Sequence, residues 1–181
     1  MELQNIPSKL VAEINNNLVV LQNPNINNFA KLEAVYNESD KINDFLKPFF
    51  SCNRGCCFCC KYDVLITKFE AMYISLKTGI NLRNNSFSFY NNTYCPFLKN
   101  NVCSIYKFRP LICRSYHVYG NPNDCEIDYK NHQSKIQIQY GTAGSGYGNA
   151  IYKEFGRFIE YINNSMFHGE KLDIRNYFSN S

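Results

Sequence analysis

Five cysteines lie within nine positions of the stretch SCNRGCCFCCKYD, residues 51–63. So many thiols in one place constrain the chain more than any other feature, because they can form a disulfide scaffold, a metal site or a reactive nucleophile. Three more cysteines follow at Cys95, Cys103 and Cys113. The ninth, Cys125, stands alone, and we expect it to be a small apolar core residue.

Disulfides are the weakest of these interpretations. A domain of 181 residues buries about two-thirds of its unfolded surface and needs no covalent support. The N-terminal stretch lacks the pattern of a leader, and no segment reaches the roughly 20 apolar residues of a membrane helix, so we expect a cytoplasmic protein with no membrane association. Thiols stay reduced in that compartment. The cluster contains no histidine to act as a base for a catalytic thiolate, so metal ligation is the expected role.

The net charge does not argue for a nucleic-acid partner. The formal charge is +4 when every cysteine counts as a neutral thiol. A divalent ion held by four thiolates carries a net charge of about −2, so two such sites would bring the total close to zero. Because no stripe of lysine and arginine stands apart from the cysteines, we expect no nucleic-acid binding.

Hydrophobic periodicity predicts a mainly α-helical single domain over 1–181. Apolar residues recur at helical spacing in two helices within residues 8–47, with Ser8 as an expected N-cap, and in a C-terminal helix over 149–167. Thr67 and Glu70 match a capping box at the start of a further helix.

The middle of the chain predicts a small β-hairpin. In YCPFLKNNVCSIY, residues 94–106, two short apolar runs flank a turn at Asn100 and Asn101. Pro110 is well placed to begin the helical turn that carries Cys113. We therefore expect a cysteine-rich metal-binding core over about residues 49–125, flanked by the N-terminal and C-terminal helices.

The spacing of the cysteines suits metal ligation. The Cys-x-x-Cys spacing lets two thiolates converge on one ion, and it occurs twice and interleaved, as Cys56 with Cys59 and Cys57 with Cys60. Adjacent side chains point apart, so these thiols need not all bind one ion. Together with the downstream cysteines they are enough for two four-coordinate sites or for one polynuclear cluster.

A cysteine signature and four further motifs then occur in a recognisable order. The pattern C-x3-C-x2-C-C is followed by LITKFEA, by CPFL and CSIY, and by RPLICRSY. Over roughly residues 49–117 this order resembles the YkgJ-type cysteine-cluster family, a zinc- or iron-chelating domain named for its CxxCxxCC signature. The first gap is one residue longer than the signature, and Cys57 is an additional thiol. The resemblance implies that seven cysteines bind metal: Cys52, Cys56, Cys59, Cys60, Cys95, Cys103 and Cys113. Cys57 is a further candidate ligand.

The resemblance leaves the metal and the use of the site open. Thiolates suit zinc and iron–sulfur clusters about equally. The expected function is metal binding, with metal ions as partners. One alternative is an enzyme that modifies a protein or small molecule, because flagellin lysine methylases carry a related cysteine pattern. The other is a scaffold in which structural zinc holds loops together and a protein partner binds.

Four residues near Cys113 are candidates for a catalytic role in the enzyme alternative: Arg109, Arg114, Tyr116 and His117. The two arginines could donate hydrogen bonds to thiolates or to an anionic substrate. They could equally pair with Glu70 or another carboxylate. His117 lies four residues after Cys113 and could ligate the metal from the next turn, or it could be a histidine whose hydrogen bonds are satisfied within the fold.

Overall fold

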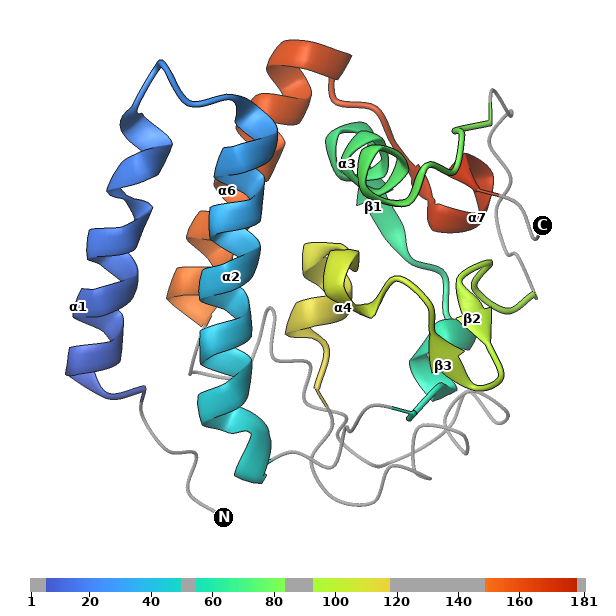
Figure 1. The fold of residues 1–181 in the computed structure, drawn as a ribbon, viewed down its shortest axis with the longest axis horizontal. Helices are drawn as coiled ribbons and strands as arrows, with labels where there is room; N and C mark the ends of the chain where they lie inside the picture. The colour runs from blue at the N-terminus through green and yellow to red at the C-terminus, as the bar shows by residue number, and fades with distance from the viewer. Residues whose placement is uncertain (1–5, 50–54, 84–92, 118–148, 179–181) are drawn as a thin grey trace.

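The structure is a computed structural model that describes residues 6–49, 55–83, 93–117 and 149–178. It is mainly α-helical with a small β-hairpin, which confirms the expected fold class (Figure 1). The elements are α1 (Ser8–Asn17), η1 (Leu18–Gln22), α2 (Asn28–Leu46), η2 (Lys47–Phe49), η3 (Phe58–Lys61), β1 (Leu65–Thr67), α3 (Lys68–Thr78), β2 (Leu98–Lys99), β3 (Val102–Cys103), η4 (Tyr106–Phe108), α4 (Leu111–Ser115), α6 (Asn149–Phe167), β4 (Lys171–Asp173) and α7 (Ile174–Tyr177).

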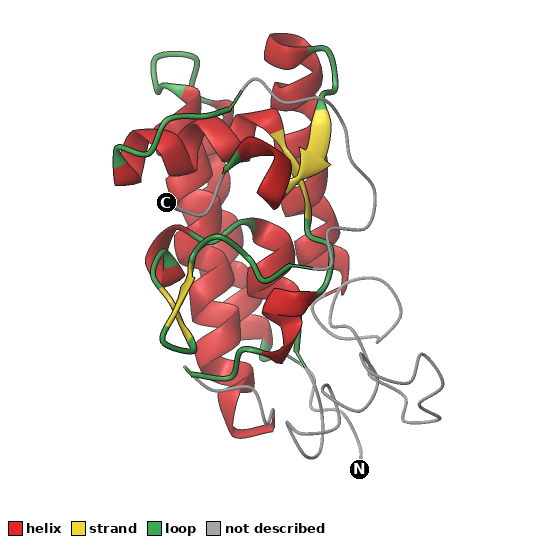
Figure 2. Cartoon of the chain, turned by 90° about the vertical axis from the view of Figure 1, so that its right-hand side faces the viewer, coloured by secondary structure: helices red, strands yellow, loops and turns green. Residues whose placement is uncertain are grey.

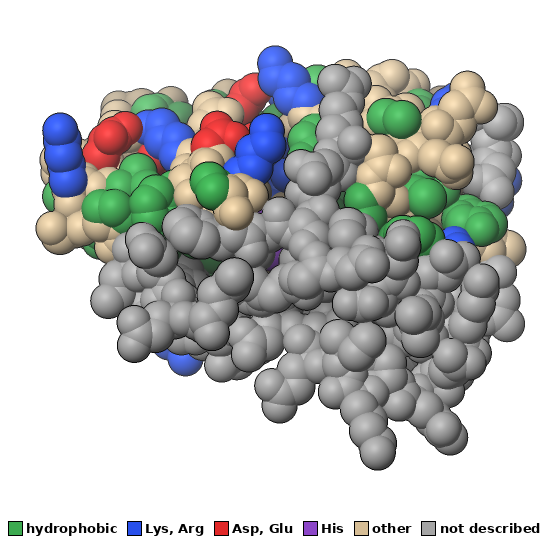
Figure 3. Space-filling model, turned by 90° about the horizontal axis from the view of Figure 1, so that it is seen from below, with side chains coloured by type: hydrophobic (Ala, Val, Ile, Leu, Met, Phe, Trp, Pro, Cys, Tyr) green, Lys and Arg blue, Asp and Glu red, His purple; other side chains and the backbone are tan. Residues whose placement is uncertain are grey.

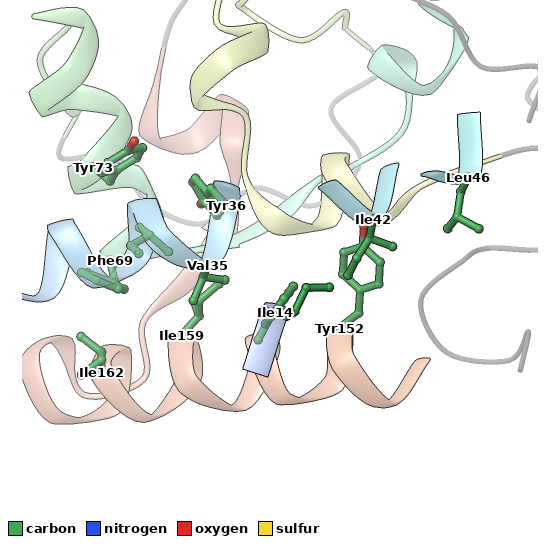
Figure 4. Close-up of a cluster of buried hydrophobic side chains, with 12 residues drawn as sticks. Ile14, Val35, Tyr36, Ile42, Leu46, Phe69, Tyr73, Tyr152, Ile159 and Ile162 are labelled. Atoms are coloured by element: carbon green, nitrogen blue, oxygen red, sulfur yellow. The ribbon is translucent and has the colours of Figure 1, made fainter. Parts of the chain in front are cut away.

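The long helices α2 and α6 carry most of the first hydrophobic core. Tyr152, Ile159 and Ile162 project from α6 toward Val35 and Ile42 of α2 (Figure 4). All five side chains are buried, and burial of each large apolar side chain contributes about 1.5–3 kcal/mol. This helical layer forms the base against which α3 and α4 pack.

Side chains cap the starts of α2 and α3 but not that of α1. Asn27 caps α2 by accepting a hydrogen bond of 2.8 Å from the amide of Ala30. Thr67 and Glu70 form the predicted capping box of α3. At α1 the expectation was wrong, because Pro7 occupies the N-cap and Ser8 is the first helical residue. The carbonyl of Pro7 accepts a hydrogen bond of 3.1 Å from the amide of Val11, so the helix begins there without a side-chain cap.

The predicted hairpin is present. Strands β2 and β3 pair antiparallel with Leu98 opposite Cys103. Asn100 and Asn101 adopt positive φ angles of 51° and 60°. A two-residue hairpin turn with positive φ at both positions favours asparagine, which explains the Asn-Asn pair.

A second small sheet joins distant parts of the chain. Strand β1, just before α3, pairs antiparallel with β4, so that Leu65 lies opposite Asp173. Both strand pairs are short and lie beside the helices (Figure 2). The β1–β4 pair brings the C-terminal segment to the end of the cysteine-rich loop. The second hydrophobic core forms here, around Ile66, Phe97 and Ile174.

The surface carries charges of both signs. Lys and Arg side chains alternate with acidic ones on the part of the lower face formed by described residues (Figure 3). Ion pairs between exposed or partly exposed side chains include Lys41 with Glu13 and Lys77 with Glu33. Within the described ranges, no helix is both long enough and apolar enough to cross a bilayer.

Candidate metal centre

Six cysteines from three segments line one pocket of about 390 Å³. Cys56, Cys59 and Cys60 come from the turn that contains η3, Cys95 and Cys103 from the hairpin region, and Cys113 from α4. These elements lie near one another in Figure 1. The seven cysteines that the structure describes, which include Cys57, are all free thiols. The sequence pattern thus predicted side chains that the fold brings to one cavity.

The remaining predicted ligands differ in their placement. Cys57 is not part of the pocket lining, and its thiol donates a long hydrogen bond of 3.8 Å to Asn101 Oδ1. Cys52 lies outside the described residues, as does Cys125, which was expected in the core. No three Cys, His, Asp or Glu side chains of the described residues are grouped closely enough to hold an ion. The thiols therefore line the walls of the pocket without converging on one point.

A tight turn positions the first group of thiols. Gly55 has a φ of 101°, a value that favours glycine, and the chain then enters the single turn of η3. The amide of Cys60 donates to the carbonyl of Cys57 at 3.0 Å, and the amide of Tyr62 donates to the carbonyl of Cys59 at 3.2 Å. These bonds close the Cys-x-x-Cys loop and turn Cys59 and Cys60 toward the pocket.

Backbone amides hold the thiols of the hairpin region. The amide of Phe97 hydrogen-bonds the Cys95 thiol, and the amide of Ile105 hydrogen-bonds the Cys103 thiol; each bond acts to lower the pKa of its cysteine. Amide donors two residues after a cysteine stabilise the thiolate and orient it. Each of the two cysteines thus has a backbone donor in place for its thiolate form.

Burial acts in the opposite direction on the same groups. It raises the pKa of Cys95 to about 12, and it raises the pKa of Cys113 well above its ordinary value. A hydrogen bond with Cys59, together with burial, raises the pKa of Cys60. Neighbouring thiols repel any negative charge and add to these increases. Without a cation the thiols of Cys60, Cys95 and Cys113 are therefore protonated at neutral pH, and a soft cation is what would favour their ionised form.

Arg109 is the basic residue of the lining. Its charge acts to lower the pKa of Cys103 and of Cys113. The guanidinium lies 3.9 Å from the ring centroid of Tyr106, in a cation–π contact. Its buried Nε has no hydrogen-bond partner among the described residues. Arg109 is thus positioned to offset negative charge in the pocket.

Arg114, the other arginine candidate, lies outside the lining and only 1% of its side chain is exposed. It donates to Asp40 Oδ1 at 2.5 Å, to the carbonyl of Arg109 at 2.8 Å, and to the carbonyl of Lys107. Its guanidinium also lies over the ring of Tyr36. These contacts match the carboxylate ion pair that was one of the two expectations for this residue.

Of the other two candidates, Tyr116 lines the pocket and His117 does not. Tyr116 lines the pocket, with its ring 6.4 Å from that of Tyr62. His117 is outside the lining, and its Nε2 lies 2.8 Å from Oδ1 of Asn43. Burial, and then the positive charge of Arg109, lower the pKa of His117 to about 4. His117 is therefore a neutral imidazole at physiological pH.

Several residues of the site carry no signal in the sequence. Tyr62, Val64, Ile105 and Tyr106 form apolar and aromatic walls, and Ile174 reaches the same pocket from the C-terminal segment. Apolar residues of these types are common throughout the chain, and their approach depends on tertiary contacts between distant segments. Only the strand pairing of β1 with β4, which local patterns do not specify, could have revealed Ile174.

Comparison with protein-family models identifies this part of the chain. Residues 51–139 match the model CxxCxxCC, described as "Putative zinc- or iron-chelating domain". This segment is therefore similar to that family of chelating domains, in agreement with its motifs. All six pocket cysteines lie within the matched range, whereas Ile174 lies beyond it. Neither a curated protein nor a solved structure matches the chain significantly.

Proposed function

We propose that the chain chelates zinc or iron with thiolates of the cysteine pocket. The observation that carries this proposal is the lining of a single cavity by six free thiols from three segments. Sulfur ligands favour zinc and iron–sulfur chemistry over magnesium or calcium, which prefer oxygen. The family match supports a zinc- or iron-chelating domain.

The electrostatics of the pocket support the same proposal. Burial and the neighbouring thiols raise the pKa of Cys95 and of Cys103, while the amides of Phe97 and Ile105 are placed to stabilise the two thiolates. A cation resolves this conflict because it replaces the protons and neutralises the negative charge. Small movements of side chains would accompany binding, since the thiols line the walls of the pocket.

The number of thiols favours more than one ion. A structural zinc takes four ligands, and six described cysteines line the pocket. We propose two ions that share thiolates, or one polynuclear cluster, including an iron–sulfur cluster. Cys52 remains a predicted ligand from the sequence. Cys57 remains the least favoured, because its side chain is directed to Asn101.

One observation favours an enzyme as the second candidate. The pocket of about 390 Å³ falls within the range of small-molecule sites. Tyr62, Tyr106 and Tyr116 line it together with Arg109, and such a wall suits a small organic substrate beside a metal. In this alternative Arg109 and Tyr116 are the candidates that could contact a substrate.

Anaerobic purification followed by elemental analysis and visible spectroscopy tests the proposal. Zinc gives a colourless protein, whereas an iron–sulfur cluster absorbs broadly in the visible range. Substitution of Cys95 and Cys103 by alanine is expected to abolish the bound metal, while Cys57→Ala serves as the matched control and retains it. A protein that contains no zinc or iron, and takes up neither when reconstituted under reducing conditions, would contradict the proposal.

A further inference from the structure

The C-terminal segment contacts the cysteine-bearing segments through a buried arginine, Arg175. We propose that Arg175 is a positioning residue of the metal centre, and that residues 171–178 form a functional part of it although they lie outside the matched family domain. This inference rests on the proposed chelating function. Arg175 would hold two cysteine-bearing segments at the separation that metal binding requires.

The guanidinium of Arg175 joins three backbone carbonyls. Its Nη2 donates to the carbonyls of Cys60 and Tyr62, each at 3.0 Å, and its Nε donates to the carbonyl of Thr93 at 2.7 Å. Only 5% of the side chain is exposed. Arginine presents its donors in a rigid planar fork, so these bonds fix the distance between residues 60–62 and the segment that leads to Cys95.

The carbonyl of Cys60 is the centre of this junction. It also accepts a hydrogen bond of 2.8 Å from the amide of Cys95. Both Cys60 and Cys95 line the pocket. Without Arg175, the carbonyl of Cys60 would keep only the hydrogen bond from the amide of Cys95. The carbonyl of Thr93 would lose its hydrogen bond from the guanidinium, so the two segments would be held together less firmly.

Asp173 fixes the orientation of Arg175. Its carboxylate accepts hydrogen bonds from Nη1 of Arg175 at 3.1 Å and from the amide of Val64 at 2.6 Å. Asp173 also caps α7 and pairs with Leu65 in the β1–β4 sheet. The arginine is therefore held by the carboxylate, by the helix cap and by the sheet before any metal binds.

Apolar contacts place the same segment against the pocket. Ile174 lines the cavity, and its amide donates to the carbonyl of Val64 at 2.9 Å. Phe178 packs edge-on against Phe97, with ring centroids 4.9 Å apart. Phe97 is the residue whose amide bonds the thiol of Cys95. The C-terminal segment thus contacts two of the three cysteine-bearing segments.

The test compares the full-length variants Arg175→Met and Arg175→Lys with the matched control Arg157→Met. Arg157 is 62% exposed and pairs on the surface of α6 with Glu154. Zn²⁺ affinity is measured by competition with a chelator under reducing conditions. The absorption of the Co²⁺-substituted protein reports ligand geometry, and amide exchange of Cys95 is measured in the metal-free protein.

We expect Arg175→Met to weaken Zn²⁺ binding by about 10–100-fold, the range for residues that support metal ligands. The Co²⁺ spectrum should change in shape, and the amide of Cys95 should exchange faster. Arg175→Lys, with fewer donors, should give an intermediate loss, and Arg157→Met should behave as wild type. A purely structural role would lower the folded fraction without altering the Co²⁺ spectrum of the protein that remains folded.

Unchanged Zn²⁺ affinity together with unchanged exchange at Cys95 in Arg175→Met would overturn the inference. If Arg175→Met does not fold, Arg175→Lys decides by the same two measurements. If the wild-type protein binds neither metal, the proposed function fails separately. Amide exchange at Cys95 then decides alone, because the positioning of the two segments precedes metal binding.

Discussion

The guanidinium of Arg114 donates a hydrogen bond of 2.5 Å to the carboxylate of Asp40, which links α4 to α2 across 74 residues of sequence. Arg114 also donates to the carbonyls of Lys107 and Arg109. It therefore holds the chain that leads from the hairpin into α4, the helix that carries Cys113. Its contacts are those of a structural residue next to the pocket.

The first prediction concerns Arg114→Met. The variant leaves two backbone carbonyls without their donor in a buried region, so the free energy of unfolding should fall by about 3 kcal/mol. Asp40→Asn should cost less than Arg114→Met, because the asparagine oxygen can still accept from Arg114 and the two backbone carbonyls keep their donor. Urea denaturation measures both. Folded Arg114→Met should retain its metal, and a loss of metal with unchanged stability would instead assign Arg114 to the site.

Glu70 is predicted to be a second structural junction. Its carboxylate accepts hydrogen bonds from the amide and hydroxyl of Thr67, from the hydroxyl of Tyr36 at 3.0 Å, and from the amide of Leu111 at 2.9 Å. It thereby caps α3 and fixes the start of α4. Glu70→Ala should lower the free energy of unfolding by about 3 kcal/mol.

The matched control for Glu70 is Glu33→Ala. Glu33 lies on α2 and makes a partly exposed ion pair with Lys77, so its loss should cost less than about 1 kcal/mol. Thermal unfolding monitored by circular dichroism compares the two variants. Equal destabilisation by both substitutions would contradict the role assigned to the buried carboxylate.

Protonation of His117 is predicted to lower the stability of the folded chain in acid. Its pKa is lowered from 6.5 to about 4 in the folded chain, so the unfolded chain binds the proton first as the pH falls. The contribution of the neutral imidazole is complete above pH 6.5 and is lost progressively as the pH falls toward 4. The total loss is about 3 kcal/mol.

The variant His117→Gln should remove that part of the acid dependence, because glutamine can still hydrogen-bond to Asn43 without titrating. His168→Asn is the control: His168 is exposed, and its φ of 52° suits asparagine. Urea midpoints measured between pH 4 and 7 give the slope of stability against pH for each variant. A wild-type slope that persists in His117→Gln would show that other groups cause it.

Metal uptake is predicted to release protons. The raised pKa values of Cys60, Cys95 and Cys113 mean that a metal must displace protons from these thiols at neutral pH. Affinity should therefore rise with pH, by about tenfold per pH unit for each proton displaced. Calorimetry in buffers of different ionisation enthalpy counts the protons. Binding of zinc that is independent of pH from 6 to 8 would argue against thiol ligands.

The parts of the fold that the sequence predicted are local. The capping box of Thr67 and Glu70 spans four residues, and the hairpin turn depends on the tolerance of Asn100 and Asn101 for positive φ. Such features are specified by neighbours along the chain, and both are present. The contact of Arg175 with Cys60 spans 115 residues, and no periodicity or spacing encodes it.

In the candidate site, too, the sequence predicted the local features and not the contacts between distant segments. Spacing indicated that the cysteines of residues 51–63 and those downstream would share one region, because few other roles suit so many thiols. It did not distinguish Cys56, which lines the pocket, from its neighbour Cys57, which does not. That difference depends on the direction of each side chain in the turn before η3. The walls formed by Tyr106 and Ile174 depend on packing alone.

The most direct measurement of the central claim is the alkylation rate of each cysteine, determined by mass spectrometry with and without Zn²⁺ under reducing conditions. Thiolates bound to a metal are shielded from alkylation, so Zn²⁺ should slow the reaction at Cys60, Cys95, Cys103 and Cys113. Cys57, outside the lining, should react at the same rate in both samples. Equal rates at all of these cysteines with and without Zn²⁺ would contradict a thiolate metal centre.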